Sequence, residues 1–278
     1  MVQAPLFCLL AITLLIAPTA SAQIPDSAKA RQDTIIEAVN DTLAQRAQRE
    51  VIRESDQIGV IEVAAVLGGV VALSVLDEPV QRWAQRNRTR TTDDISSVFR
   101  KEGEPIFYAG VSLTTLAAGV VLQDADVRRA GGRMVAAVLL AGLTSEGIKR
   151  LVGRSRPNER AGAFSFHPFT SLDDSAGFST RSSFPSGHTT AAFAIATSLS
   201  DDINEPLVSV GLYAFALGTA YSRINDNRHW LSDTALGAVL GIASAKFVNG
   251  HWQFFGIEPP GFLITPTGTP TLGYTLDF

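Results

Sequence analysis

Apolar residues along this chain gather in six runs that are separated by shorter polar segments. The runs cover residues 58–76, 106–122, 134–148, 189–199, 207–221 and 234–248, and they are rich in alanine and glycine. Such runs are typical of buried helices, so the pattern predicts six core helices. Residues 82–105, between the first two runs, are polar and carry several arginines, with a predicted helix cap near Thr92 and Asp93. We expect this segment to cover a site as a lid.

The two ends of the chain differ from the core. Residues 1–22 form an apolar segment ending in Ala20, Ser21 and Ala22, which predicts a signal peptide cleaved after Ala22, although no lysine or arginine precedes its apolar part. Residues 23–56 are charged and predict a helical arm. Residues 251–278 form a Pro/Thr/Gly-rich tail whose alternating end, from Leu272 to Phe278, predicts a short edge strand or a loose tail. Residues 57–250 remain as one catalytic domain.

Composition narrows the class of protein. Of the 278 residues, 46% are hydrophobic, which is enough for one large helical core. The net charge of −4 at pH 7 excludes the basic footprint of a nucleic-acid binder. The single cysteine, Cys8, lies in the predicted signal peptide, so the mature chain has no disulfide. We expect an exported protein, periplasmic or membrane-associated.

Three short motifs carry the candidate chemistry. They read KRLVGRSRP at 149–157, PSGH at 185–188 and SRINDNRHWLSD at 222–233. Phosphoryl transfer spreads negative charge over the phosphate oxygens, so fixed cations and N–H donors do most of the catalysis. Lys149, Arg156 and Arg223 would form an anion clamp. Ser186 and Gly187 precede an apolar run, which would put their donors at the anion-favouring start of a helix.

The motifs also contain two histidines, the number that a covalent route requires. One imidazole attacks phosphorus while the other protonates the departing oxygen. We assign the nucleophile to His229 because Asp233 follows four positions later, on the same face if both lie in a helix. His188, beside the anion-binding turn, is left as the general acid. The sequence has no CxxC or HExxH pattern, so we expect catalysis without a metal or other cofactor.

Together the three motifs resemble those of the type 2 phosphatidic acid phosphatase and vanadium haloperoxidase superfamily. The resemblance covers residues 57–250 and implies an all-α bundle of the acid phosphatase/haloperoxidase type. It implies a phosphate site made by Lys149, Arg156, Ser186, Gly187, His188 and Arg223, with His229 as the nucleophile and Asp233 as its partner. The implied activity is hydrolysis of phosphate monoesters or diphosphates, with a lipid as the expected substrate, and the implied site faces outward.

Two other functions stay open at this point. Vanadate mimics phosphate, so a vanadate-dependent haloperoxidase would use a similar pocket, and a non-catalytic bundle could still bind anions. Neither the substrate's identity nor the oligomeric state follows from the motifs, since a phosphate site recognises the head of the substrate only.

Membrane insertion is the hardest question for the sequence. A spanning helix needs about 20 apolar residues, and the apolar runs are short or interrupted by Glu62, Asp202 or Arg223. These lengths favour a water-soluble or surface-bound bundle, whereas the resemblance favours membrane association. If the signal is cleaved and three runs cross before Lys149, the site would face the cytoplasm, against the implied orientation.

Several further ionisable residues are left outside the site. His167 and His251 have no partner at useful spacing and are interpreted as ordinary loop histidines. Arg150 and Arg154 are expected to pair locally, for example Arg150 with Glu146 at helical spacing. Glu62 is interpreted as a structural residue.

Overall fold

The computed structural model of the protein describes residues 56–102, 104–169, 180–257, 261–264 and 270–273. The chain divides into two compact units, residues 1–47 and 48–278, and every described residue belongs to the second. The predicted signal peptide, the predicted arm up to residue 55 and the last five residues of the tail lie outside the described residues. For these segments the sequence-based interpretation stays a prediction.

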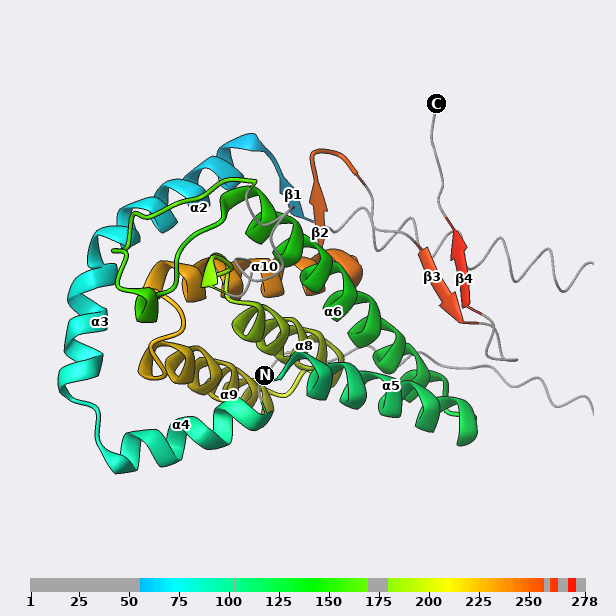
Figure 1. The fold of residues 1–278 in the computed structure, drawn as a ribbon. Helices are drawn as coiled ribbons and strands as arrows, with labels where there is room; N and C mark the ends of the chain where they lie inside the picture. Colours follow the sequence, from blue (N-terminus) through cyan, green and yellow to red (C-terminus); the bar gives the residue numbers. More distant parts are fainter. Residues whose placement is uncertain (1–55, 103, 170–179, 258–260, 265–269, 274–278) are drawn as a thin grey trace, which may run out of the picture. The chain divides into compact units, whose positions relative to one another are not determined.

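The fold is all-α, as predicted, and each of the six apolar runs lies largely in a helix (Figure 1). A 3-10 turn, η1 (Ser74–Leu76), joins the first two helices, and a second, η2 (Pro157–Glu159), follows the first motif. The helices are α2 (Val60–Leu73), α3 (Asp77–Arg86), α4 (Arg90–Glu102), α5 (Pro105–Val121), α6 (Ala125–Val152), α8 (Gly187–Ile203), α9 (Pro206–Asn225) and α10 (Leu231–Val248).

Helix α6 is much longer than the apolar run that predicted it. Its first turns are polar, but Asp124 caps the helix by accepting from the backbone N–H groups of Asp126 and Val127. It ends at Gly153, whose φ of +60° suits the left-handed conformation that closes many helices. The cap and the glycine therefore set the helix bounds, and hydrophobicity marks only the middle.

The polar stretch after the first run forms two helices, α3 and α4. The predicted cap near Thr92 and Asp93 is wrong by one turn: the Thr89 hydroxyl accepts from the Thr92 backbone N–H, and the Thr92 hydroxyl accepts from the Thr89 N–H. This reciprocal pair starts α4 at Arg90. Thr92 is therefore the third residue of the helix and not its cap.

Strands are few and short. β1 (Asp56–Ile58) pairs in parallel with β2 (Trp252–Phe254), which joins the start of α2 to the end of α10. β3 (Gly261–Ile264) pairs antiparallel with β4 (Pro270–Gly273). β4 contains Leu272, the first residue of the predicted alternation.

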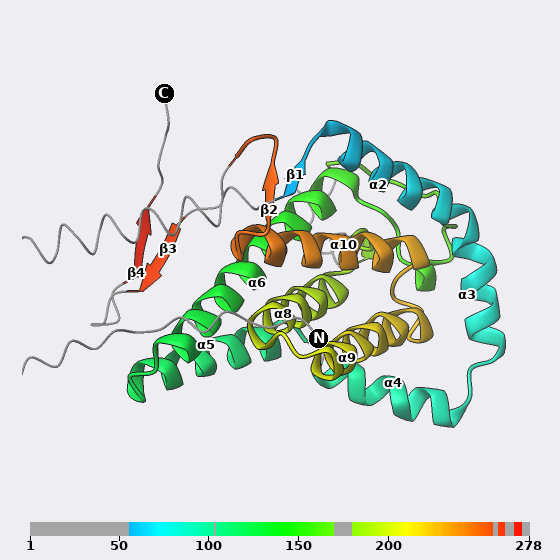
Figure 2. The same ribbon diagram turned by 180° about the vertical axis from the view of Figure 1, so that it is seen from behind.

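Helix α8 lies at the centre of the bundle, between α6, α9 and α10 (Figures 1 and 2). Residues 189–198 are all buried, because α5, α6, α9 and α10 pack against α8. Two glycines of α10 permit that helix to approach α8 closely. A Cβ on Gly237 would lie 2.8 Å from the Ser186 carbonyl oxygen, and one on Gly241 would lie 2.4 Å from that of Thr190. Small residues at this spacing let helix backbones touch.

Many apolar side chains on the outer helices are exposed. In α2, Ile61 is 80% exposed, and Leu207 at the start of α9 is 87% exposed. Among the described residues, three helices are long and apolar enough to cross a membrane: Val60–Arg86, Pro206–Asn225 and Leu231–Val248. The bent pair α4–α5 would make a fourth. A water-soluble protein rarely exposes so much apolar surface, so the fold supports membrane association.

The charged residues that argued against spanning helices lie at helix ends. Glu62 is in the first turn of α2, where its carboxylate accepts from the Gly59 N–H. Asp202 is in the last turn of α8 and Arg223 in the last turn of α9. They therefore do not interrupt an apolar span, and the structural role expected for Glu62 is confirmed as a helix cap.

Candidate active site

The three motifs meet at one end of the bundle. The last turns of α6 and α9 and the first turns of α8 and α10 come together there, far apart in sequence but adjacent in space (Figure 1). A cavity of about 670 Å³ opens at this end. It is lined by Arg88, Arg100, Glu104, Arg156, Glu159, Thr180, His188, Arg223, Asp226 and Arg228. Arg88, Arg100 and Glu104 come from the polar stretch expected to form a lid.

The PSGH motif forms the N-terminus of α8. Ser186 is the residue before the helix and is fully buried, and its N–H donates to the carbonyl oxygen of Asp233 at 3.0 Å. A Cβ on Gly187 would lie 2.9 Å from Lys149 Nζ. The glycine thus allows the Lys149 ammonium to approach the first N–H groups of the helix. Positive charge and free N–H donors are concentrated at this point, as anion binding requires.

The three predicted cations surround this helix end. Lys149 Nζ bonds to Glu146 Oε1 at 2.5 Å, and Arg156 Nη2 donates to Ser182 Oγ at 3.0 Å. Arg223 is 5% exposed and lies 3.6 Å from Asp226. Within the described part of the chain, the buried donors Arg156 Nε, Arg223 Nε, Arg223 Nη1 and His188 Nε2 have no hydrogen-bond partner. Such unmatched donors are what an anion of several oxygens would satisfy.

Burial and mutual repulsion act on these cations. Burial first, and then the nearby Arg228 and Arg223, lower the pKa of Arg156 to about 10. Arg156 stays charged at neutral pH, although burial removes water from its guanidinium and the neighbouring arginines repel it. A bound phosphate would relieve both, since it supplies negative charge and hydrogen-bond acceptors at once.

His229 lies in the loop before α10, not on the helix. The interpretation that placed it on one helix face with Asp233 is therefore wrong in its geometry, although the two groups are near each other at 3.7 Å. Its Nδ1 lies 2.7 Å from the carbonyl oxygen of Ser183. A carbonyl can only accept, so Nδ1 carries the proton and the neutral ring has its lone pair on Nε2. The backbone of Ser183, which the sequence did not indicate, orients this imidazole.

Both histidines are held neutral by their surroundings. Burial, followed by Arg156 and Arg223, lowers the pKa of His229 well below its usual value. Burial, followed by Arg223, His229, Lys149 and Arg156, lowers the pKa of His188 to about 3. The same three cations, Lys149, Arg156 and Arg223, act on both rings, so these side chains lie near one another. A neutral His229 has the free lone pair that a nucleophile needs.

Asp233 is held by a buried network that the sequence analysis missed. It accepts from Ser183 Oγ at 2.5 Å, from the Trp230 N–H at 2.8 Å and from Arg154 Nη1 at 2.6 Å. Arg154 also donates to Asp77 of α3 at 2.7 Å. Arg154 is 1% exposed and pairs across the fold, so the expectation of a local partner is wrong. The signal in the sequence that could have suggested a role for Arg154 is its place in the first motif, two residues before Arg156.

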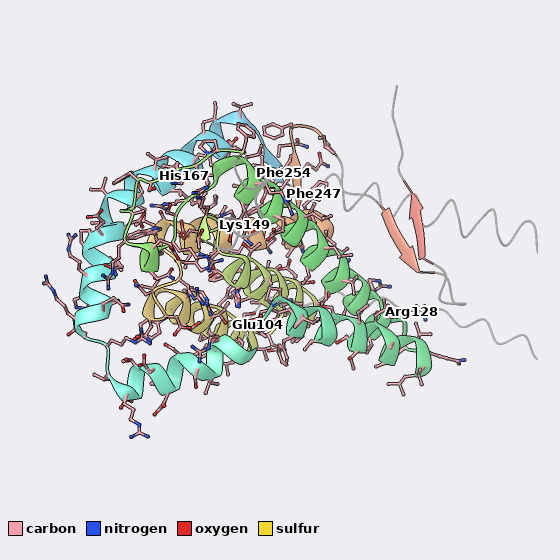
Figure 3. All side chains as sticks on the ribbon, viewed as in Figure 1. Glu104, Arg128, Lys149, His167, Phe247 and Phe254 are labelled. Atoms are coloured by element: carbon pink, nitrogen blue, oxygen red, sulfur yellow. The ribbon has the colours of Figure 1, made fainter. Side chains whose placement is uncertain are left out.

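The remaining excluded residues lie outside the cavity lining. His167 bonds to Ser165, and His251 lies 3.6 Å from Asp201 at the other end of the bundle. Glu146 pairs with Lys149. Figure 3 shows His167 apart from Lys149 and Glu104.

With this geometry in place, the chain can be compared with known proteins. Residues 130–255 match the sequence profile of the PAP2 superfamily. This part of the chain is similar to that superfamily. The matched region contains all three motifs and every predicted site residue. Helices α2 to α5 precede it.

Curated relatives share part of this chain's sequence. A lipid A 1-phosphatase of Porphyromonas gingivalis is 46% identical over 72 residues, which is 25% of this chain and 16% of the relative. A lipid A 1-phosphatase of Rhizobium johnstonii is 32% identical over 113 residues, or 40% of this chain and 43% of the relative. The chain thus spans less than half the length of these relatives.

Two solved structures resemble the fold of this chain. LpxE of Aquifex aeolicus has a TM-score of 0.46 and 22% identity, covering 61% of this chain and 92% of that one. A transmembrane PAP2 type phosphatidylglycerolphosphate phosphatase of Bacillus subtilis has a TM-score of 0.46 and 18% identity, covering 67% and 94%.

Proposed function

We propose that this PAP2 protein is a lipid phosphatase that hydrolyses phosphate monoesters or diphosphates through a phosphohistidine on His229. The observation that carries the proposal is the single cavity in which two arginines and His188 present unmatched donors. A second imidazole with a free Nε2 lies beside the same cations. This combination supplies an anion clamp, a nucleophile and a proton donor at one place.

In the first step, His229 Nε2 attacks phosphorus while the phosphate oxygens are held by Lys149, Arg156, Arg223 and the start of α8. The N–P bond forms as the P–O bond to the leaving group breaks, and His188 gives its proton to the departing oxygen. The ring becomes positively charged. The Nδ1–H bond to Ser183 and the Asp233 carboxylate 3.7 Å away stabilise that charge.

In the second step, water attacks the phosphoryl group and gives its proton to His188, and the N–P bond breaks to release phosphate. Each proton that leaves His188 in the first step returns in the second. The site's own cations neutralise the phosphate throughout, so the proposed reaction uses no metal ion. Activity that is unchanged by a strong chelator would support this part of the proposal.

A lipid substrate fits the surroundings of the site. The helices that lead to the cavity expose large apolar side chains, as Ile61 and Leu207 show. A lipid phosphate held at a membrane surface would present its head group to the end of such a bundle. The names of the relatives, lipid A 1-phosphatase and phosphatidylglycerolphosphate phosphatase, refer to lipid substrates and support this choice.

The side of the membrane that the site faces stays a prediction. The chain runs across the bundle three times before Lys149, in α2–α3, α5 and α6, so residue 56 and the site lie at opposite ends. The outward orientation that we predict therefore requires residue 56 to lie on the cytoplasmic side. Cys8 is the one cysteine of the sequence, so an exposed Asn158→Cys probe in a Cys8→Ser background would report orientation through an impermeant thiol reagent.

The mechanism is tested by phosphate release and by trapping. His229→Ala should abolish release from phosphatidate, lipid A phosphate and isoprenoid diphosphate alike. Wild-type protein quenched during turnover of ³²P-labelled substrate should carry label that is stable to base and labile to acid, as expected of phosphohistidine. Undiminished turnover in His229→Ala would sink the mechanism. Peroxide-driven halide oxidation that needs added vanadate would instead favour a haloperoxidase.

A further inference from the structure

Glu104 faces the proposed general acid from outside the three motifs. It is the residue before α5, and its Oε1 lies 3.6 Å from His188 Nε2. Both residues line the same cavity. Figure 3 shows Glu104 at the junction between α4 and α5. The sequence analysis assigned no role to it.

The neighbours of His188 make a carboxylate useful there. Its ring is surrounded by Lys149 of α6, Arg156 of the following loop, Arg223 of α9 and His229 before α10, and all of them lower its pKa. The rest of the cavity adds Arg88, Arg100, Glu159, Asp226 and Arg228. A general acid must carry a proton when the substrate arrives, yet this ring lies among cations. Of the carboxylates in the cavity lining, Glu104 is the one within 4 Å of the His188 ring.

We propose that Glu104 is a positioning residue that keeps the proton on His188 Nε2 while a phosphate ester is bound. The inference rests on the proposed function and adds a residue to it. The substrate's negative charge offsets Lys149, Arg156 and Arg223, and the Glu104 carboxylate then stabilises the imidazolium. Its side chain is 52% exposed, so it also connects the buried ring to protons of bulk water.

The local structure gives Glu104 little else to do. It precedes α5 as the cap residue, but its side chain makes no capping hydrogen bond. A half-exposed carboxylate without a capping role contributes little to folding. Replacing it should therefore leave the bundle intact and change the charge near His188 and near Arg223, which lines the same cavity.

The first test compares leaving groups of different basicity. An alkyl phosphate, phosphatidate in mixed micelles, needs a proton on its departing oxygen, whereas p-nitrophenyl phosphate releases a far weaker base that does not. Glu104→Gln should lower kcat/KM for phosphatidate by about tenfold and move the alkaline limb of its pH profile down by about one pH unit. For p-nitrophenyl phosphate the change should stay below about twofold by the same reasoning.

The matched control is Glu159→Gln, which removes an exposed carboxylate from the same cavity without a contact to His188. It should change both substrates equally and by less than about twofold, as a surface charge does. An equal loss for both substrates in Glu104→Gln would overturn the proposal, and so would a gain in activity.

The second test does not depend on turnover. The chain has four histidines, so the ¹⁵N signals of labelled imidazoles can be assigned with a His188→Ala reference. With sulfate bound, the His188 signal should titrate about one pH unit lower in Glu104→Gln than in wild type. Coincident titration curves would overturn the proposal even if the protein hydrolysed none of the tested esters. Absence of hydrolysis with a shifted curve would count against the proposed function alone.

Discussion

Replacing Arg154 by alanine should lower the stability of this protein more than any surface substitution, because it leaves two buried carboxylates without their cation. Asp77 and Asp233 are both 0% exposed, and Arg154 donates to them at 2.7 and 2.6 Å. Removing one partner of a buried ion pair costs about 3–5 kcal/mol. For a domain of this size, about 2–4 °C of melting temperature is lost per kcal/mol, so a drop of about 10 °C is expected.

The assay is thermal unfolding of detergent-purified protein, with phosphate release measured on the same samples. Arg82→Ala is the matched control, since it breaks an arginine–glutamate pair whose side chains are 51% and 45% exposed. Such a pair contributes less than about 1 kcal/mol. Adding Asp77→Ala to Arg154→Ala removes one stranded carboxylate and should recover part of the loss. Equal melting temperatures for Arg154→Ala and Arg82→Ala would refute the buried-network argument.

Three other predictions concern the anion site. Gly187→Ala puts a Cβ 2.9 Å from Lys149 Nζ; the flexible ammonium should move away, with a loss of about tenfold or more in kcat and an unchanged melting temperature. Sulfate binding should take up a proton near neutral pH, because the pKa of His188 is about 3 without an anion and rises when an anion binds. The affinity for sulfate should therefore fall as pH rises. Calorimetry in buffers of different ionisation enthalpy measures the proton uptake. The melting temperature should fall as pH drops below about 6.5. In the unfolded chain His188 and His229 become protonated there, whereas in the folded protein their lowered pKa values keep both rings neutral.

Each of these has its own check. For the glycine, Gly211→Ala on α9 meets nothing within 4 Å and should leave activity unchanged. For proton uptake, His188→Gln should make the sulfate enthalpy independent of the buffer. For the pH-dependent melting, His188→Gln should reduce the slope of melting temperature against pH between about pH 6.5 and 4, since it removes one of the two histidines with a lowered pKa. A slope of opposite sign would show that the rings are charged in the folded protein.

Much of the fold could be read from hydrophobicity. Apolar runs found six helices, because burial of a helix against its neighbours requires apolar residues along most of its length. They did not find α3 and α4, which are polar, or the first turns of α6, which depend on the cap made by Asp124. Capping is a hydrogen-bond contact between particular atoms, so it moves the ends of a helix without changing the pattern of hydrophobic residues.

The sequence proposed the members of the candidate site but not the contacts between them. Lys149, Arg156, Ser186, Gly187, His188, Arg223, His229 and Asp233 were chosen from residue type and spacing, and the structure brings them to one end of the bundle. The hydrogen bond of His229 to the Ser183 carbonyl was not foreseen, because any residue at 183 supplies a carbonyl. Arg154 was set aside because its partners, Asp77 and Asp233, are 77 and 79 positions away.

The sequence by itself determined which chemical groups are present, that six helices form and that the motifs suit a phosphate, since these depend on composition and on spacing within a segment. Only the tertiary structure decided how the imidazole of His229 is held, which cation joins α3 to α10, and that Glu104 reaches His188. Those outcomes are contacts of 2.6–3.6 Å between distant segments. They depend on how the helices pack, and no local pattern encodes a distance between two helices.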